Sequence, residues 1–91
     1  MIKTVKHKGL KDLLSKGQSA RVRQDLVPRC IRRLDAINAA TRPEQLNIPG
    51  FDFHAPRGKP QRYSVHVNGP WGITFSWDGE DATNVDLEQY H

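Results

Sequence analysis

Hydrophobic positions along the chain repeat with two different periods, and the change comes near residue 50. In the first half they recur every three or four residues, which indicates amphipathic helices. Leu10, Leu13 and Leu14 mark a first helix, which we expect to end at Gly17 because glycine readily adopts the left-handed conformation. A second helix has Pro28 in its opening turn, where a missing N–H does no harm. Its hydrophobic stripe consists of Val27, Ile31, Leu34 and Ile37.

The polar side of the second helix is strongly basic. Arg29, Arg32 and Arg33 are expected on or beside its solvent flank, and Asp25 is placed to pair with Arg29 four residues later. Residues 41–50 then read as a loop or a single helical turn that ends at a Pro-Gly pair.

From residue 51 onward, hydrophobic and polar residues alternate, which indicates half-buried strands. The predicted strands are 51–55, 63–67, 71–77 and 83–87, and residues 2–5 form a possible short opening strand. Two helices followed by an antiparallel meander predict a small α+β fold, with the two N-terminal helices packed on one face of the sheet. We expect a single domain over residues 1–91.

The alternation also predicts how the strands pair. A three-residue turn after Val67 would pair Val67 with Trp71 and Val65 with Ile73, which keeps one face of the sheet hydrophobic. His66 then lies opposite Gly72, on the polar face with Thr74 and Ser76. The same reasoning at the second turn pairs Ile73 with Val85.

The distribution of charge along the chain and the single cysteine limit the possible functions. Residues 1–62 hold all 14 Lys and Arg against five acidic residues, a balance of +9, whereas residues 63–91 carry a balance of −5. A basic surface of this kind suits a phosphate backbone, although a solvated helical face explains it equally well. The single cysteine, Cys30, excludes an intramolecular disulfide, and no Cys/His spacing resembles a zinc site. We therefore expect a cytoplasmic protein with no metal, no cofactor, no signal peptide and no membrane span.

Candidate chemistry lies on the polar face and around it. Imidazoles, cations and a phenol with few carboxylates suit metal-free cleavage of RNA, in which the 2′-oxygen attacks the neighbouring phosphorus. Histidine can donate or accept a proton near neutral pH, and arginine binds phosphate oxygens bidentately. Taken singly, each of these residues is also explained as an ordinary surface residue. The candidates are His54, Arg57, Lys59, Arg62, His66, Tyr90 and His91.

Several segments, taken in their order and spacing, resemble the HigB branch of the RelE/ParE toxin superfamily, the toxic half of bacterial type II toxin–antitoxin pairs. They are MIKTVKHKGLKDLLSKG, LDAINAATRPEQLNIPGF, HAPRG, YSVHVNGPWGITF and VDLEQYH. The resemblance runs nearly end to end. It implies a compact RelE-like fold and a metal-free endonuclease that cuts translated mRNA in the ribosomal A site. It also implies a helix-turn-helix antitoxin of the HigA type, through which the toxin would reach operator DNA.

The resemblance also implies roles for individual residues. The family's functional histidine before the basic loop corresponds to His54, its loop cation to Arg57, and its closing tyrosine and histidine to Tyr90 and His91. His54 and the terminal pair would share proton transfer and substrate placement, while the cations bear the phosphate charge. The general acid and the general base are not assigned.

This chain departs from the family at Gly72, where HigB-like sequences typically read WRITF with a functionally important arginine. The register argument places this residue on the polar face, so the change implies a folded but weakened nuclease. The glycine is explained either by a substitution that makes the toxin tolerable to its host or by natural drift. Two other function classes stay open: a non-catalytic toxin of the RelE/ParE fold, and a basic module that binds ribosomes or RNA.

Overall fold

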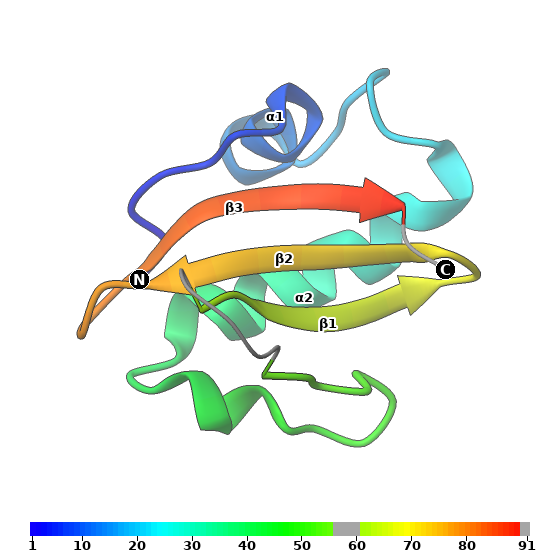
Figure 1. Ribbon diagram of the computed structural model, residues 1–91. Coiled ribbons are helices and arrows are strands. Elements are labelled where there is room, and N and C mark those ends of the chain that lie inside the picture. The colour runs from blue at the N-terminus through cyan, green and yellow to red at the C-terminus, as the bar shows by residue number, and fades with distance from the viewer. Residues whose placement is uncertain (56–60, 90–91) are drawn as a thin grey trace.

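The computed structural model describes residues 1–55 and 61–89. Two α-helices precede a three-stranded antiparallel sheet of order β1-β2-β3, and two short 3₁₀ turns flank the second helix (Figure 1). The elements are α1 (Lys8–Lys16), η1 (Gln24–Leu26), α2 (Val27–Ala39), η2 (Pro43–Leu46), β1 (Tyr63–Asn68), β2 (Trp71–Trp77) and β3 (Ala82–Gln89). The predicted α+β fold of two helices and a small antiparallel sheet is confirmed.

Helix α1 ends where its sequence predicts, and a side chain caps its start. At its start, Nδ1 of His7 accepts a hydrogen bond from the backbone N–H of Leu10 over 3.3 Å, which satisfies one of the free donors of the first turn. At its end, Gly17 has φ 75°, and its N–H donates to the Leu13 carbonyl over 3.0 Å. The left-handed conformation at this cap favours glycine.

Helix α2 packs its stripe against the sheet, with Cys30, Leu34 and Ile37 buried. The expected pairing of Asp25 with Arg29 is not observed. Instead, Arg23 binds both carboxylate oxygens of Asp25 over 2.6 Å each, because η1 brings the two side chains together before α2 begins. Both side chains are exposed, so this ion pair contributes little stability.

The first hairpin confirms most of the predicted register. Val65 pairs with Ile73, and His66 pairs with Gly72. The predicted pairing of Val67 with Trp71 is wrong, since Asn68 pairs with Trp71 and the register shifts between His66 and Asn68. The bulge shortens the turn while Val67 stays buried.

The second hairpin is shifted from its predicted register along the strands themselves. Ile73 pairs with Leu87 and not with Val85. Between Thr74 and Ser76 the register shifts, because β3 places Asn84 and Val85 where one residue is expected. Asn84 has φ 51°, a left-handed conformation that asparagine tolerates. The extra residue lets Ala82 and Val85, three positions apart, both face the core.

Two predicted strands are present only as isolated bridges. The N-terminal segment runs parallel to β3, with bridges from Ile2 to Ala82 and from Val5 to Val85. On the other side of the sheet, the segment 51–55 makes one antiparallel bridge to β1, between His54 and Ser64. Both outer strands of the sheet therefore have a partly paired neighbour.

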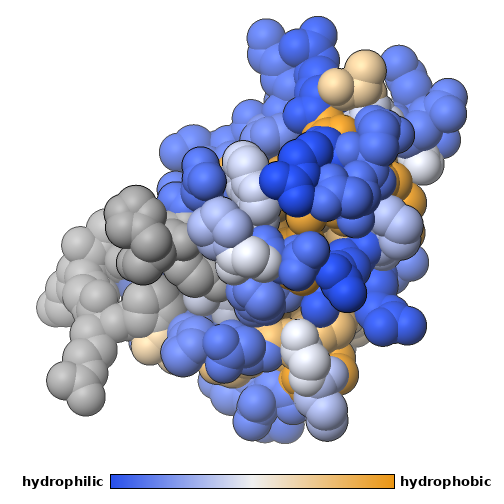
Figure 2. Space-filling model, turned by 90° about the vertical axis from the view of Figure 1, so that its right-hand side faces the viewer, coloured by the Kyte–Doolittle hydropathy of each residue, from blue (hydrophilic) through white to orange (hydrophobic). Residues whose placement is uncertain are grey.

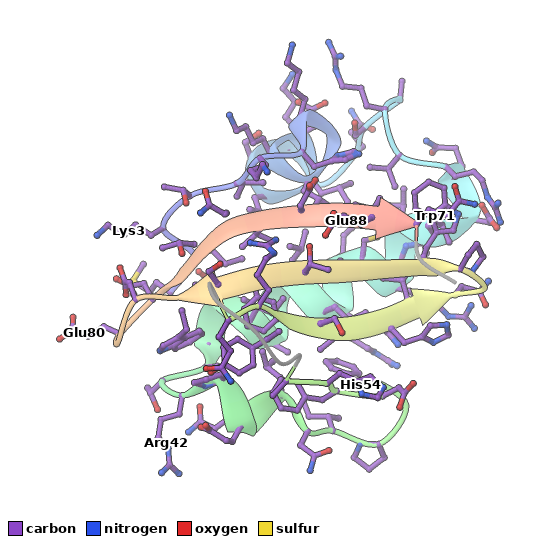
Figure 3. All side chains as sticks on the ribbon, viewed as in Figure 1. Lys3, Arg42, His54, Trp71, Glu80 and Glu88 are labelled. Atoms are coloured by element: carbon purple, nitrogen blue, oxygen red, sulfur yellow. The ribbon has the colours of Figure 1, made fainter. Side chains whose placement is uncertain are left out.

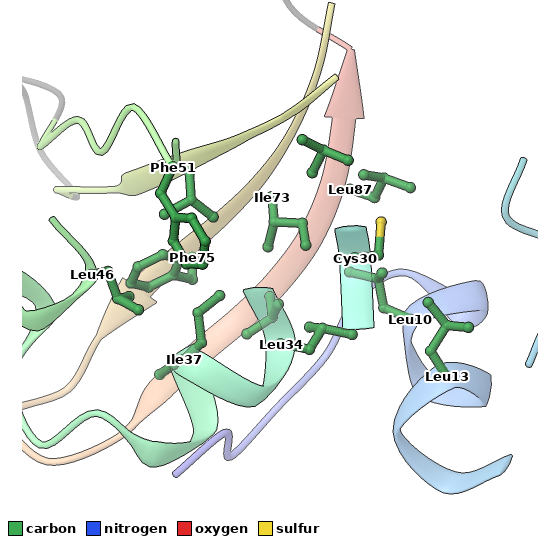
Figure 4. Packing of buried hydrophobic residues seen from close by; sticks show 14 of the residues in the cluster. Leu10, Leu13, Cys30, Leu34, Ile37, Leu46, Phe51, Ile73, Phe75 and Leu87 are labelled. Atoms are coloured by element: carbon green, nitrogen blue, oxygen red, sulfur yellow. The ribbon is translucent and has the colours of Figure 1, made fainter. Parts of the chain in front are cut away.

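The core lies between the helices and the inner face of the sheet (Figure 4). Ile73, Phe75 and Leu87 project from the strands toward α2, and Leu10 projects from α1. No helix within residues 1–55 and 61–89 combines the length and the hydrophobicity needed to cross a membrane.

The buried thiol of Cys30 yields a first testable prediction. Burial raises its pKa to about 11, so very little thiolate forms at pH 8. We expect iodoacetamide to alkylate Cys30 about 10²-fold more slowly in the native protein than in guanidinium chloride, because the thiolate is the reactive form. Mass spectrometry of timed samples measures both rates. Equal rates would show that the thiol is accessible in the native state.

Candidate active site

The face of the sheet that points away from α2 carries polar side chains in two neighbouring rows. One row joins Ser64, Thr74 and Asp86 across the three strands, and the next joins His66, Gly72 and Glu88. Residues opposite each other in antiparallel strands face the same side, and the intervening residues Val65 and Ile73 are buried in the core. We call this surface the open face; it comprises Ser64, His66, Gly72, Thr74, Ser76, Asp86 and Glu88.

Arg62 reaches across the open face from the start of β1. Its Nη1 donates to Oγ of Ser76 over 3.0 Å, and its Nη2 donates to Oγ1 of Thr74 over 2.9 Å and to the Asn84 carbonyl over 3.0 Å. None of these three acceptors is a carboxylate, so the guanidinium is fixed in place by neutral oxygens. A cation held in this way keeps its charge available for a phosphate.

Thr74 links Arg62 to the neighbouring row. Its hydroxyl accepts the hydrogen bond from Arg62 and donates one to Oε2 of Glu88. Glu88 lies directly opposite Gly72 and projects from β3 on the viewer's side of the sheet in Figure 3. A chain of hydrogen bonds therefore runs from Arg62 to the carboxylate beside position 72.

His54 lies at the edge of this surface, beyond β1 (Figure 3). Its backbone exchanges two hydrogen bonds with Ser64, of 3.0 and 2.9 Å, so its side chain starts on the same side of the sheet as that of Ser64. Two strand spacings, about 10 Å, separate its backbone from that of Thr74. The ring is largely exposed, and its Nε2 lies 3.4 Å from Oδ1 of Asp52. This arrangement leaves His54 accessible to a substrate that lies over the open face.

The residues on either side of His54 hold it in place. Phe51 is buried, and the ring of Phe53 stacks on Tyr63 with a centroid distance of 5.9 Å. Tyr63 in turn stacks on Phe75 in the core at 5.6 Å. The segment that carries His54 is therefore packed against the sheet on one side while its imidazole faces solvent.

His66 and Gly72 lie at the turn end of the open face. Nε2 of His66 is 3.0 Å from the Gly69 carbonyl, so this ring closes the β1–β2 turn. Gly72 is buried. Its pairing with His66 puts it on the polar side of the sheet, as the sequence predicts. The surface at this end of the molecule is mostly hydrophilic, with small hydrophobic spots between the polar side chains (Figure 2).

The structure brings together four of the candidates, namely His54, Arg62, His66 and Gly72, on or beside one face of the sheet. The other four, Arg57, Lys59, Tyr90 and His91, lie outside the described residues. The last described residue of β3, Gln89, pairs with Trp71 next to Gly72. Among residues 1–55 and 61–89, no cluster of three His, Cys, Asp or Glu side chains could hold a metal ion.

Sequence reasoning missed Thr74 and Ser76 as the residues that hold Arg62, and it missed Glu88. The polar alternation of β2 already placed Thr74 and Ser76 on the open face, but hydroxyl side chains gave no further signal. Glu88 was missed because the predicted register, without a bulge, would have placed Asp86 opposite Gly72. The β2–β3 turn is one residue longer than predicted, since Trp77 pairs with Ala82, and the bulge at Asn84 adds a second residue; together they move Glu88 into that place.

Comparison with known proteins agrees with this fold. Residues 3–91 match the family model described as the RelE-like toxin of type II toxin–antitoxin system HigB. The chain is also 40% identical, over 92 residues that cover all of both chains, to a protein of Proteus vulgaris named Endoribonuclease HigB. The resemblance inferred from the sequence motifs is therefore confirmed. This chain belongs to the HigB-like family of RelE-like toxins from type II toxin–antitoxin systems.

Proposed function

We propose that this protein is a toxin that cleaves translated mRNA on the ribosome without a metal ion. The observation that carries the proposal is the guanidinium of Arg62, held by neutral oxygens on the open face at Thr74, whose row across the sheet continues to His54. A nuclease needs such a cation where negative charge develops on phosphorus. The Proteus vulgaris relative, named as an endoribonuclease, supports the same activity.

In the proposed reaction, the 2′-oxygen of the target nucleotide forms a bond to the adjacent phosphorus, and the bond from phosphorus to the 5′-oxygen breaks. One group takes the proton of the 2′-hydroxyl and another gives a proton to the departing 5′-oxygen, which leaves a 2′,3′-cyclic phosphate. His54 and the terminal pair Tyr90 and His91 share these two transfers. Arg62, with Arg57 and Lys59, bears the charge of the phosphorane, and His66 contacts the RNA at the turn end.

Gly72 weakens this site. A side chain at position 72 would extend over the open face between His66 and Glu88, where the family typically has an arginine. Loss of one preorganised charge stabiliser costs about 10²–10³ in rate. We therefore infer that this chain is a folded, attenuated nuclease.

Its partners follow from the family. Membership in a type II toxin–antitoxin family means that an antitoxin neutralises the toxin. We propose that this antitoxin is a helix-turn-helix protein of the HigA type, that the chain reaches operator DNA only through it, and that the toxin acts in the cytoplasm as a single domain.

Primer extension on cellular mRNA tests the function. After induction of the toxin, a reporter message with an intact start codon should acquire new 5′ ends inside its reading frame, and the same message without a start codon should not. Cleavage of both messages would exclude ribosome dependence. Ribosome binding without cleavage, even after Gly72→Arg, would favour a non-catalytic binding module, and inhibition of DNA supercoiling would favour a toxin directed at gyrase.

Arg62 provides a more specific prediction. The substitution Arg62→Gln removes the cation but leaves a side chain that can still hydrogen-bond to Thr74 and Ser76. We expect toxin–RNA affinity to fall, and the slope of log K against log[salt] to decrease by about one, because one phosphate contact is lost. Fluorescence anisotropy with a labelled oligoribonucleotide over a range of salt concentrations measures both quantities.

Arg42→Gln serves as the matched control, since Arg42 is exposed at the start of η2, below the sheet in Figure 3. It should leave the slope nearly unchanged. Equal effects of the two substitutions would mean that the RNA responds to overall charge and not to the open face.

A further inference from the structure

Arg33 is buried, although its place on α2 predicted a solvent-exposed side chain. It is only 5% exposed, between the helix and the sheet. The sequence prediction is wrong because Arg33 lies between the neighbouring stripe residues Cys30, Leu34 and Ile37 on the face that packs against β1. A buried charge is retained only when its hydrogen-bonding groups find partners.

The guanidinium of Arg33 binds three backbone carbonyls from three parts of the chain. Its Nε donates to His66 of β1 over 2.6 Å, its Nη2 to Gly50 over 3.2 Å, and its Nη1 to Arg29 of α2 over 3.2 Å. Its central carbon also lies 4.6 Å from the centre of the Phe51 ring, a cation–π contact. Arg33 thus connects the helix, the sheet and the segment that leads to His54.

The same junction is closed by a backbone hydrogen bond. The N–H of His66 donates to the Phe51 carbonyl over 2.6 Å, while the His66 carbonyl accepts from Arg33. Three residues later, His54 pairs with Ser64. The segment 50–54 is therefore attached to β1 at both ends, and Arg33 supplies the attachment at the Gly50 end.

We propose that Arg33 is a positioning residue that sets the placement of His54 over the open face. The proposal rests on the proposed function, in which His54 acts on the RNA held at Arg62. Without the guanidinium, the Gly50 and His66 carbonyls lose their common donor, and the hydrogen bonds that still join the segment 50–54 to β1 are the one from His66 to Phe51 and the bridge at Ser64. Arg33 touches no substrate, and its effect passes through the backbone to His54.

If Arg33 only stabilises the fold, its variants should behave differently from what is expected if Arg33 positions His54. In the first case, Arg33 variants that remain folded would cleave RNA as fast as any other variant of equal thermal stability. In the second case, the rate constant at saturating ribosomes falls even in fully folded protein, because a displacement of about 1 Å at a reacting group costs about 10²-fold. The ribosome concentration for half-saturation changes little in that case, since the basic surface is unaltered.

The experiment compares Arg33→Lys and Arg33→Met with Leu13→Ala. Leu13 is buried in α1 and lies at the opposite end of the core from Phe51 in Figure 4, so its loss lowers stability without reaching the segment 50–54. All three changes are made in the Gly72→Arg background and assayed at a temperature where circular dichroism shows complete folding. Arg33→Lys keeps the charge and one donor, so it remains informative if Arg33→Met does not fold.

We expect the saturating rate constant to fall about 10²-fold for Arg33→Met and about tenfold for Arg33→Lys. Leu13→Ala should stay within about twofold of its parent. In NMR spectra, both Arg33 variants should show a shifted ring signal for His54 and faster amide hydrogen exchange at His66, whereas Leu13→Ala should show neither. Rates and spectra of folded Arg33→Lys that match those of Leu13→Ala would overturn the proposal. The NMR spectra test whether Arg33 positions His54 even if none of the proteins cleaves RNA. Absence of cleavage in all of them would count against the proposed function and not against the positioning role of Arg33.

Discussion

Gly72→Arg should raise the rate of cleavage of translated mRNA about 10²–10³-fold, the amount that one preorganised charge stabiliser contributes to a transition state. The restored guanidinium would project from the row of His66 and Glu88, next to the row in which Arg62 is held. Two cations on one face would then share the charge of the phosphorane. Single-turnover cleavage of a message bound in the ribosomal A site measures the rate directly, and growth arrest after induction gives the corresponding result in cells.

Gly72→Gln is the matched control. Glutamine adds a side chain of similar reach and hydrogen-bonding capacity but no charge, so we expect less than a tenth of the gain obtained with arginine. An equal gain would mean that packing at position 72, and not charge, limits the reaction. No gain with either residue, in protein that remains folded, would refute the inference that Gly72 attenuates this chain.

His54→Gln, in the Gly72→Arg background, should reduce the rate about 10²–10⁴-fold, the contribution of a general acid or base. Glutamine keeps a polar side chain of comparable size at the edge of the sheet but cannot exchange a proton near neutral pH. The backbone bridge to Ser64 does not depend on the side chain, so folding should be unchanged.

His7→Asn is the control for His54→Gln. His7 caps α1 through its Nδ1, and asparagine preserves a cap of that kind, so the variant loses one histidine without losing the helix. It should cleave RNA at the rate of its parent. A His54 variant that does the same would exclude His54 from the chemistry.

The sequence predicted the helices and the two faces of the sheet because both depend on local periodicity. Gly17 ends α1 and Pro28 opens α2 for conformational reasons that belong to single residues. The alternation in β2 correctly assigned Gly72 to the polar side, since the face of a strand residue depends only on parity. Predictions of this kind need no knowledge of the tertiary structure.

The predictions that failed depend on contacts between distant segments. Two bulges, after His66 and at Asn84, each add a residue that no repeat in the sequence marks. The second one, together with a β2–β3 turn one residue longer than predicted, brings Glu88 opposite Gly72. Arg33 is buried because carbonyls 17 and 33 residues away accept its hydrogen bonds. The helical pattern predicts that such an arginine is exposed, because backbone acceptors cannot be recognised from residue types in the sequence.

The candidate site was predicted partly from local periodicity and partly missed because it depends on contacts between distant segments. Parity placed His66 and Gly72 together, and the bridge of His54 to Ser64 adds a third residue to the same side. The roles of His54 and of Arg57, Tyr90 and His91 came from the resemblance to the HigB family, since spacing alone supports an ordinary surface as well. Arg62 was a candidate from the sequence, and what the structure contributes is its placement, which depends on three acceptors that lie on β2 and β3.

The most direct test of the central claim is cleavage of a message with a single 2′-deoxynucleotide at the scissile position. With the Gly72→Arg protein and programmed ribosomes, the all-ribose message should yield a 5′ fragment ending in a 2′,3′-cyclic phosphate, and the 2′-deoxy message should stay intact. Cleavage of the 2′-deoxy message at a comparable rate would contradict attack by the 2′-oxygen, and with it the role assigned to the open face.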